Sequence, residues 1–116
     1  MKFSNLIALT CIVLGMSVGQ LLFKQAARVF AQSDSLARGL LSPYLALAIF
    51  LYGILTLAWV WQLSMVDLSR AFPFMALTFA VVPLLSTIFL GEPTSPRYWG
   101  GVGLMVVGII LAQSDT

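Results

Sequence analysis

Apolar residues occur along this chain in four long segments, separated by polar stretches. The segments cover residues 6–30, 44–63, 71–90 and 98–112. Because an α-helix rises about 1.5 Å per residue, about 20 apolar residues cross the roughly 30 Å hydrocarbon core of a bilayer. The pattern therefore predicts four transmembrane helices, the last of them somewhat short, in one domain over residues 1–116.

The connections between these segments indicate which helices are neighbours. Residues 67–70 and 91–97 form brief polar stretches, and residues 32–43 form a longer one. Short connections force consecutive helices to lie side by side in opposite directions. We therefore expect an all-α membrane protein folded as an up-down-up-down bundle.

Composition supports a membrane protein and excludes other classes. Hydrophobic residues make up 60% of the chain and charged residues only 9%, against about 25% charged in average proteins. The net charge of +2 is too small and too dispersed for a nucleic-acid interface. With no histidine and one cysteine, Cys11, the sequence provides neither an intramolecular disulfide nor a Cys/His metal cluster. Cys11 is expected to be a small buried hydrophobe, and no cofactor is expected.

Catalysis finds no support in the residue pattern. The sequence offers no Ser/His/Asp set, no paired carboxylates and no glycine-rich phosphate loop after a strand, so we do not expect an enzyme. Lys2 and residues 6–14 outline a signal peptide, but Lys24 and Arg28 would then lie before the cleavage-like residues 29–31. The first segment is therefore interpreted as a transmembrane helix.

The first segment contains the most informative polar residues. Gln20, Lys24 and Arg28 follow one another at steps of four and share one helix face, which Ser17 continues deeper. A charge inside hydrocarbon is costly, so these cations would face a cavity that receives an anionic ligand. Alternatively, the helix leaves the hydrocarbon near Phe23 and both cations simply reach the headgroups. The sequence leaves both interpretations open.

Three other side chains are candidates for the same cavity. Tyr52 and Trp59 fall on one face of the second segment, although Trp59 also suits an anchor at the membrane interface. Arg70 is a candidate second cation at the cavity mouth. Its alternative role is an exposed ion pair with Asp67 at a helix start, which would contribute little.

Two prolines interrupt the third segment. Pro73 is expected in the first helical turn, where proline is tolerated. Pro83 is expected in mid-span, where it removes a backbone hydrogen bond and kinks the helix. This kink would be either a hinge for alternating access or a static bend.

The fourth segment carries a face of small residues. Gly101 and Gly108 lie two helical turns apart with Met105 between them, and small residues let helices approach closely in a bilayer. We expect a dimer interface here, the alternative being packing within the bundle. The basic residues divide almost evenly between the two membrane sides, so an antiparallel dimer is permitted.

These features resemble the drug/metabolite transporter superfamily, in particular its small four-helix members related to the small multidrug resistance transporters. The run 19–26 is similar to the end of the first helix in that group, and Gly101 and Gly108 match its paired-glycine dimerisation motif. Within the group, the chain is most similar to the subunits that flip undecaprenyl-phosphate-linked aminoarabinose across the bacterial inner membrane. The most specific part of this likeness is the stretch 92–102, which includes Glu92, Pro93, Pro96 and Arg97.

The resemblance also implies a difference from drug exporters. Proton-coupled exporters of this family rely on a glutamate midway along the first helix, where this chain has Met16. Without that carboxylate, the exchange of protons for a lipophilic cation loses its mechanism. A lipid phosphate is a suitable counter-charge for the cationic face instead.

The expected function is a flippase, or a flippase subunit, for a polyprenyl-phosphate-linked sugar or similar anionic lipid in the bacterial inner membrane. Lys24 and Arg28 would hold the phosphate, and Gln20 and Ser17 would hydrogen-bond the headgroup. The partner would be a second copy of the chain or a related small subunit, and no nucleic acid is expected. The alternatives are a non-transporting subunit that stabilises a partner, and a cation exporter that uses Glu92 or Asp67, the carboxylates at span ends.

Overall fold

The computed structural model describes residues 2–114, and every regular element in this range is an α-helix. The all-α class predicted from the sequence is therefore confirmed. The number of helices differs from four because a short helix follows the first apolar segment and the third segment is divided in two. The helices are α1 (Phe3–Gln32), α2 (Leu36–Leu40), α3 (Pro43–Leu63), α4 (Leu68–Ala76), α5 (Thr78–Leu90) and α6 (Pro96–Ser114).

Three stretches of the described chain are long and apolar enough to cross a membrane. They are α1, α3 and the continuous stretch Leu68–Leu90, which α4 and α5 form together. These stretches make the chain a multi-pass membrane protein. α6 has polar residues at both ends and is not among the three, so a fourth span remains a prediction.

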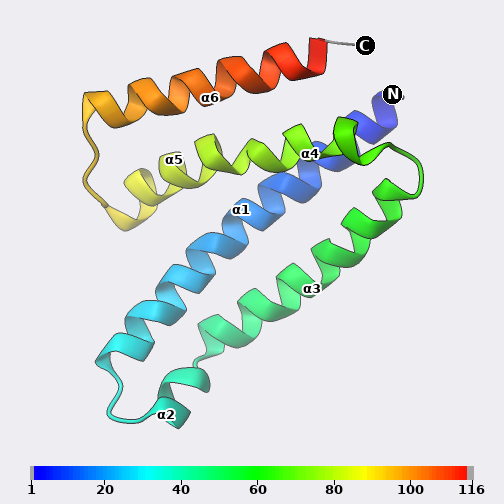
Figure 1. Ribbon diagram of the computed structural model, residues 1–116. Coiled ribbons are helices and arrows are strands. Elements are labelled where there is room, and N and C mark those ends of the chain that lie inside the picture. Colours follow the sequence, from blue (N-terminus) through cyan, green and yellow to red (C-terminus); the bar gives the residue numbers. More distant parts are fainter. Residues whose placement is uncertain (1, 115–116) are drawn as a thin grey trace.

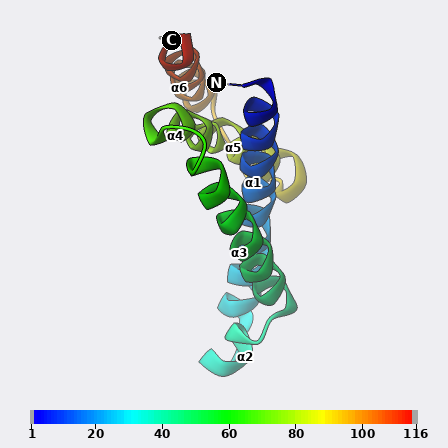
Figure 2. The same ribbon diagram turned by 90° about the vertical axis from the view of Figure 1, so that its right-hand side faces the viewer.

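The long helices lie side by side in the order α3, α1, α4–α5 and α6, with α3 and α6 at opposite edges (Figure 1). Each long helix runs opposite to the previous one, as the short connections predict. The Cα atoms extend over 52 × 37 × 17 Å, so the molecule is a thin slab (Figure 2). The expected up-down-up-down arrangement therefore takes the form of a flat layer of helices (Figure 1).

The buried side chains gather on α1, which has neighbours on two sides. Leu9 and Val13 are fully buried, and Ile12 and Met16 nearly so. The outer helices instead leave many large apolar side chains exposed, as expected for surfaces that meet lipid or another subunit. Cys11 is exposed, so the expectation of a buried cysteine is wrong: the helix turns it to the side opposite Leu9 and Val13.

Two glycines of α1 allow α3 to approach closely. A Cβ atom on Gly15 would lie 2.9 Å from Leu55 Cδ1, and one on Gly19 would lie 2.6 Å from Tyr52 Cδ2. Real Cβ atoms do not approach neighbours so closely, so the Tyr52 ring occupies space that only glycine leaves free. Gly19 thereby sets the position of Tyr52 beside the polar face of α1.

The third apolar segment is interrupted at Leu77, between α4 and α5. Pro73 lies inside α4 and Pro83 inside α5. The Leu77 N–H donates to Phe74 O at 3.0 Å, and the Thr78 hydroxyl donates to Met75 O at 2.8 Å, which makes a tight turn between the two helices. The helix begins at Leu68, so Pro73 stands in its interior and the expected first-turn position is wrong.

Gly19→Ala is expected to destabilise the protein by about 1–3 kcal/mol, because the added methyl group must displace the Tyr52 ring. Gly103→Ala is the matched control: it gains the same helix propensity, but its Cβ meets nothing within 4 Å. Thermal unfolding in detergent should show a Tm several degrees lower for Gly19→Ala than for Gly103→Ala. Equal Tm values for the two variants would contradict the close packing of α1 on α3.

Candidate functional site

The polar face of α1 meets α3 through one side-chain hydrogen bond. Gln20 Nε2 donates to the Tyr52 hydroxyl oxygen at 2.7 Å. The ring of Phe23 packs edge-on against Tyr52, with 5.2 Å between the ring centroids. Tyr52 and Trp59 were the two aromatic candidates on α3, and of these Tyr52 contacts the polar face of α1.

Lys24 meets a carboxylate from a distant part of the sequence. Its Nζ lies 3.5 Å from Glu92 Oε2, and the two side chains are 48% and 36% exposed. Glu92 follows Gly91, which takes the left-handed backbone conformation (φ 66°) at the end of α5. The Glu92 N–H also donates to Ser86 O at 3.3 Å, so both the turn and a backbone bond fix where the carboxylate stands.

Arg28 reaches the same end of α5. Its Nη2 donates to the carbonyl oxygen of Leu90 at 3.4 Å. The last carbonyls of a helix lack partners within the helix and carry partial negative charge, so they favour a cation. Lys24, Arg28 and Glu92 thus form one cluster of two cations and one carboxylate, which we call the Lys24 cluster.

Two predicted residues lie outside the Lys24 cluster. Ser17 is fully buried, and its hydroxyl donates to Val13 O at 2.9 Å within α1, so it is not directed at a headgroup. Trp59 is half-buried on α3, seven residues beyond Tyr52, which corresponds to about 10 Å along the helix axis.

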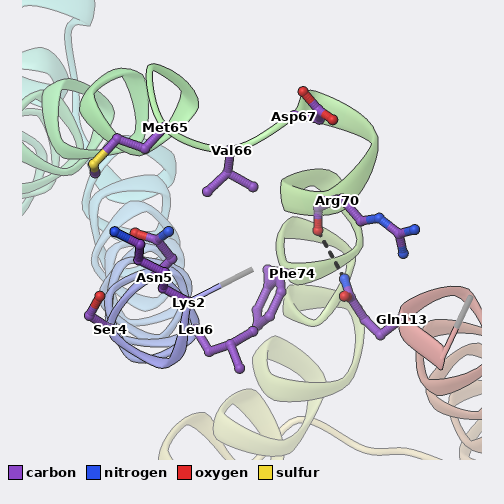
Figure 3. Close-up of a pocket in the computed structure, with 10 residues that line it drawn as sticks. All are labelled: Lys2, Ser4, Asn5, Leu6, Met65, Val66, Asp67, Arg70, Phe74 and Gln113. Atoms are coloured by element: carbon purple, nitrogen blue, oxygen red, sulfur yellow. Dashed lines mark hydrogen bonds between the residues drawn. The ribbon is translucent and has the colours of Figure 1, made fainter. Parts of the chain in front are cut away.

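Arg70 lies at the opposite end of the molecule. It lines a cavity of about 1100 Å³ together with Lys2 and Asp67, at the start of α1, the start of α4 and the end of α6 (Figure 3). Gln113 Nε2 donates to the carbonyl oxygen of Arg70 at 3.0 Å and closes one side of this cavity. The structure therefore does not bring Arg70 to the Lys24 cluster.

The predicted glycine face of α6 is open. A Cβ atom on Gly101 or Gly108 would meet nothing within 4 Å, so these glycines do not serve close packing within the described chain. Met105 and Gly108 line an apolar groove of about 590 Å³ between α6 and the α4–α5 pair. The alternative of packing within the bundle loses support, and the dimer interface remains a prediction.

The family-like stretch 92–102 begins in the connection between α5 and α6 and continues into α6. Pro96 opens α6, where the Tyr98 N–H donates to the Ser95 hydroxyl at 3.2 Å. The Trp99 indole N–H donates to the Thr94 hydroxyl at 2.7 Å and folds the connection back. Pro93 and Arg97 are exposed, so within this stretch Glu92 alone joins the Lys24 cluster.

Sequence reasoning did not recognise Glu92 as the partner of Lys24. The topology contains the signal: if consecutive spans alternate in direction, the first and third spans end on the same side of the membrane. Lys24 and Arg28 lie near the end of the first span, and Glu92 follows the end of the third. Their proximity is therefore a consequence of the helix order.

Comparisons with known proteins agree with this organisation. The EamA-like transporter family matches residues 1–113. A protein of Serratia proteamaculans named "Probable 4-amino-4-deoxy-L-arabinose-phosphoundecaprenol flippase subunit ArnE" is 38% identical over 93 residues, covering 80% of this chain and 81% of that protein. A protein of the same name from Yersinia pseudotuberculosis serotype O:1b is 36% identical over 103 residues, covering 89% and 85% of the two chains. No solved structure matches. Since the family match extends over almost the whole chain, this protein belongs to the EamA-like transporter family, within the drug/metabolite transporter superfamily.

Proposed function

We propose that this chain is a subunit of a flippase that moves a polyprenyl-phosphate-linked amino sugar across the bacterial inner membrane. The observation that carries this proposal is the Lys24–Glu92 pair, which offers one positive and one negative group at the end of a membrane-spanning helix. The names of the relatives supply the chemistry of the lipid: a sugar with an amino group, a phosphate and a long apolar chain.

The headgroup matches the charges of the Lys24 cluster. The lipid phosphate is an anion, for which Lys24 and Arg28 are suitable partners through charge-assisted hydrogen bonds. The amino group of the sugar is a cation at neutral pH, for which Glu92 is a suitable partner. When the headgroup binds, Lys24 pairs with the phosphate and Glu92 pairs with the amino group, so each charge keeps a partner of opposite sign.

The geometry of the Lys24–Glu92 pair indicates that separating the two side chains costs little free energy. The Nζ–Oε2 distance of 3.5 Å is long for a charged hydrogen bond, and both side chains are more than one-third exposed. Pairs of this kind contribute about 1 kcal/mol or less to stability. A ligand that brings both complementary charges therefore has little to overcome when it separates Lys24 from Glu92.

The neighbouring residues would bind the sugar, while the apolar chain stays in the bilayer. The Gln20 amide and the Tyr52 hydroxyl are exposed or half-exposed next to the Lys24 cluster, and they suit the hydroxyl groups of a sugar. The outer helices carry many exposed apolar side chains on which a polyprenyl chain can lie. Only the headgroup then has to cross the membrane.

Assembly and movement complete the proposal. The open face of Gly101, Met105 and Gly108 would meet a second copy of the chain or a related small subunit. The interruption at Leu77, between Pro73 and Pro83, would let α4 and α5 change their angle during transport.

Lys24→Ala and Lys24→Glu are expected to abolish flipping, because each removes the cation that holds the phosphate. Lys24→Arg should keep partial activity, and Arg38→Ala, which removes an exposed cation on α2, should keep full activity. The measurement is transport of 4-amino-4-deoxy-L-arabinose-phosphoundecaprenol in membranes that contain the full chain and any subunit that accompanies it. Full activity of both Lys24→Ala and Lys24→Glu would remove Lys24 from the mechanism.

Glu92→Gln is expected to change selectivity, because it removes the partner of the sugar's amino group. The variant should lose about tenfold or more in apparent affinity for the amino-sugar lipid, as for other charge-assisted bonds. Its affinity for the same lipid with a hydroxyl group in place of the amine should change far less. A uniform loss for both lipids would show that Glu92 only positions Lys24.

Gly101→Leu and Gly108→Leu are expected to weaken subunit association, because each fills the face that a neighbouring helix would approach. Gly103→Leu is the matched control, since Gly103 is also exposed but points to another side of α6. Energy transfer between labelled chains in bilayers should fall severalfold for the first two variants only. Equal transfer in all three would place the interface elsewhere.

A further inference from the structure

The cavity at the start of α1 is a second region with polar and charged side chains, apart from the Lys24 cluster, in a largely apolar molecule. Its lining side chains come from the start of α1, the α3–α4 connection, α4 and the end of α6 (Figure 3). Its volume of about 1100 Å³ is ample for a sugar phosphate, since ligand pockets usually hold about 300–1000 Å³.

The charges around this cavity repeat those of the Lys24 cluster. Lys2 and Arg70 are its two cations and Asp67 is its carboxylate, just as Lys24, Arg28 and Glu92 are at the other end. Ser4, Asn5 and Gln113 add neutral hydrogen-bonding groups, as Gln20 and Tyr52 do there. Both ends therefore carry the types of side chain that suit a headgroup with a phosphate, an amine and hydroxyl groups, although among the described residues contacts between charged groups occur only at the Lys24 cluster.

The two places are separated by about the thickness of the hydrocarbon core. Leu6 lines the cavity and Lys24 follows 18 residues later, which is five full turns on the same face of α1. The separation along the helix axis is about 27 Å, against a core of about 30 Å. The two charged groups thus stand where the two membrane surfaces would be.

Between the two ends the helix is closed by packing. Leu9, Val13 and Ser17 lie along this part of α1 and are fully buried. A headgroup cannot pass them without a movement of the neighbouring helices, so the cavity and the Lys24 cluster are separate sites and not parts of one channel.

A buried polar group also lies near the cavity. Gln62 on α3 is 1% exposed, and its Oε1 accepts no hydrogen bond from the described part of the chain. It stands one helical turn before Met65, which lines the cavity. Unpaired buried acceptors are rare in native proteins and call for a partner.

From these observations, and resting on the proposed flippase function, we propose that the cavity of Lys2, Asp67 and Arg70 is a second headgroup site. It would hold the phosphate-linked sugar at the membrane surface opposite the Lys24 cluster, so that one site receives the lipid and the other releases it. Lys2 and Arg70, which stand on different sides of the cavity, are the cations available to the phosphate, and Asp67 is the carboxylate available to the amino group (Figure 3). The ligand is lipid-linked and not a free anion, because apolar Leu6, Met65, Val66 and Phe74 line the same cavity.

The test is equilibrium binding of 4-amino-4-deoxy-L-arabinose-phosphoundecaprenol to the full chain, purified with any subunit that accompanies it. The wild-type chain should bind two lipids, and Arg70→Gln and Lys2→Gln should each weaken one site by about tenfold or more. Lys24→Gln should weaken only the other site. Arg70→Lys should restore most of the binding lost in Arg70→Gln, and Arg38→Gln should change neither site.

The possible failures are distinguishable. Two unchanged sites in both Arg70→Gln and Lys2→Gln would overturn the second site while leaving the Lys24 site intact. An unchanged pair of sites in Lys24→Gln would instead contradict the proposed function at the first site. A last binding experiment uses inorganic phosphate as the ligand. If phosphate binds the cavity as tightly as the lipid does, the cavity is a site for soluble anions and the proposal fails.

Discussion

The structure depends on the cost of placing charge at the edge of an apolar molecule. Lys24 stands on a helix that is otherwise suited to hydrocarbon, and a lone cation there would be unfavourable. α5 ends at Gly91 in the left-handed conformation, and this turn brings Glu92 Oε2 to 3.5 Å from Lys24 Nζ. The carbonyl oxygen of Leu90, at the end of the same helix, accepts a hydrogen bond from Arg28. Because the Lys24–Glu92 pair is partly exposed and weak, it neutralises the charges without holding them rigidly together, as the proposed exchange with a ligand requires.

The molecule is a thin slab because few of its side chains are buried in a hydrophobic core. Burial is concentrated on α1, where Gly15 and Gly19 let α3 approach, while α3, α5 and α6 turn apolar surface outward. In water such a surface would be a liability, but in a bilayer it is neutral toward lipid and available to a second subunit. Under the proposed function, the same openness would let a lipid headgroup reach either end of α1 from the side of the slab.

The sequence predicted the helical class, the multi-pass character and the family, because each depends on composition, periodicity and local motifs. It also grouped Gln20, Lys24 and Arg28 correctly on one face, since that follows from spacing alone. It could not assign Ser17, whose hydroxyl is bound to its own helix, nor separate Arg70 from Lys24, because both depend on how helices pack. For Glu92 the sequence offered a place in a family-like stretch and an alternative role in a cation exporter, but not the pairing with Lys24, although alternating spans place both residues on one side of the membrane.

The central claim is that the Lys24 ammonium binds the phosphate of the transported lipid. The chain has two lysines, Lys2 and Lys24, so labelling lysine Nζ with ¹⁵N gives two signals, and a Lys2→Arg variant assigns them. In bilayers of phosphorus-free glycolipid, the added amino-sugar lipid is the only source of ³¹P. We predict a ¹⁵N–³¹P dipolar coupling at Lys24 that corresponds to about 4 Å, as for a direct charge-assisted hydrogen bond. No coupling at Lys24, with the lipid bound at saturation, would contradict the account.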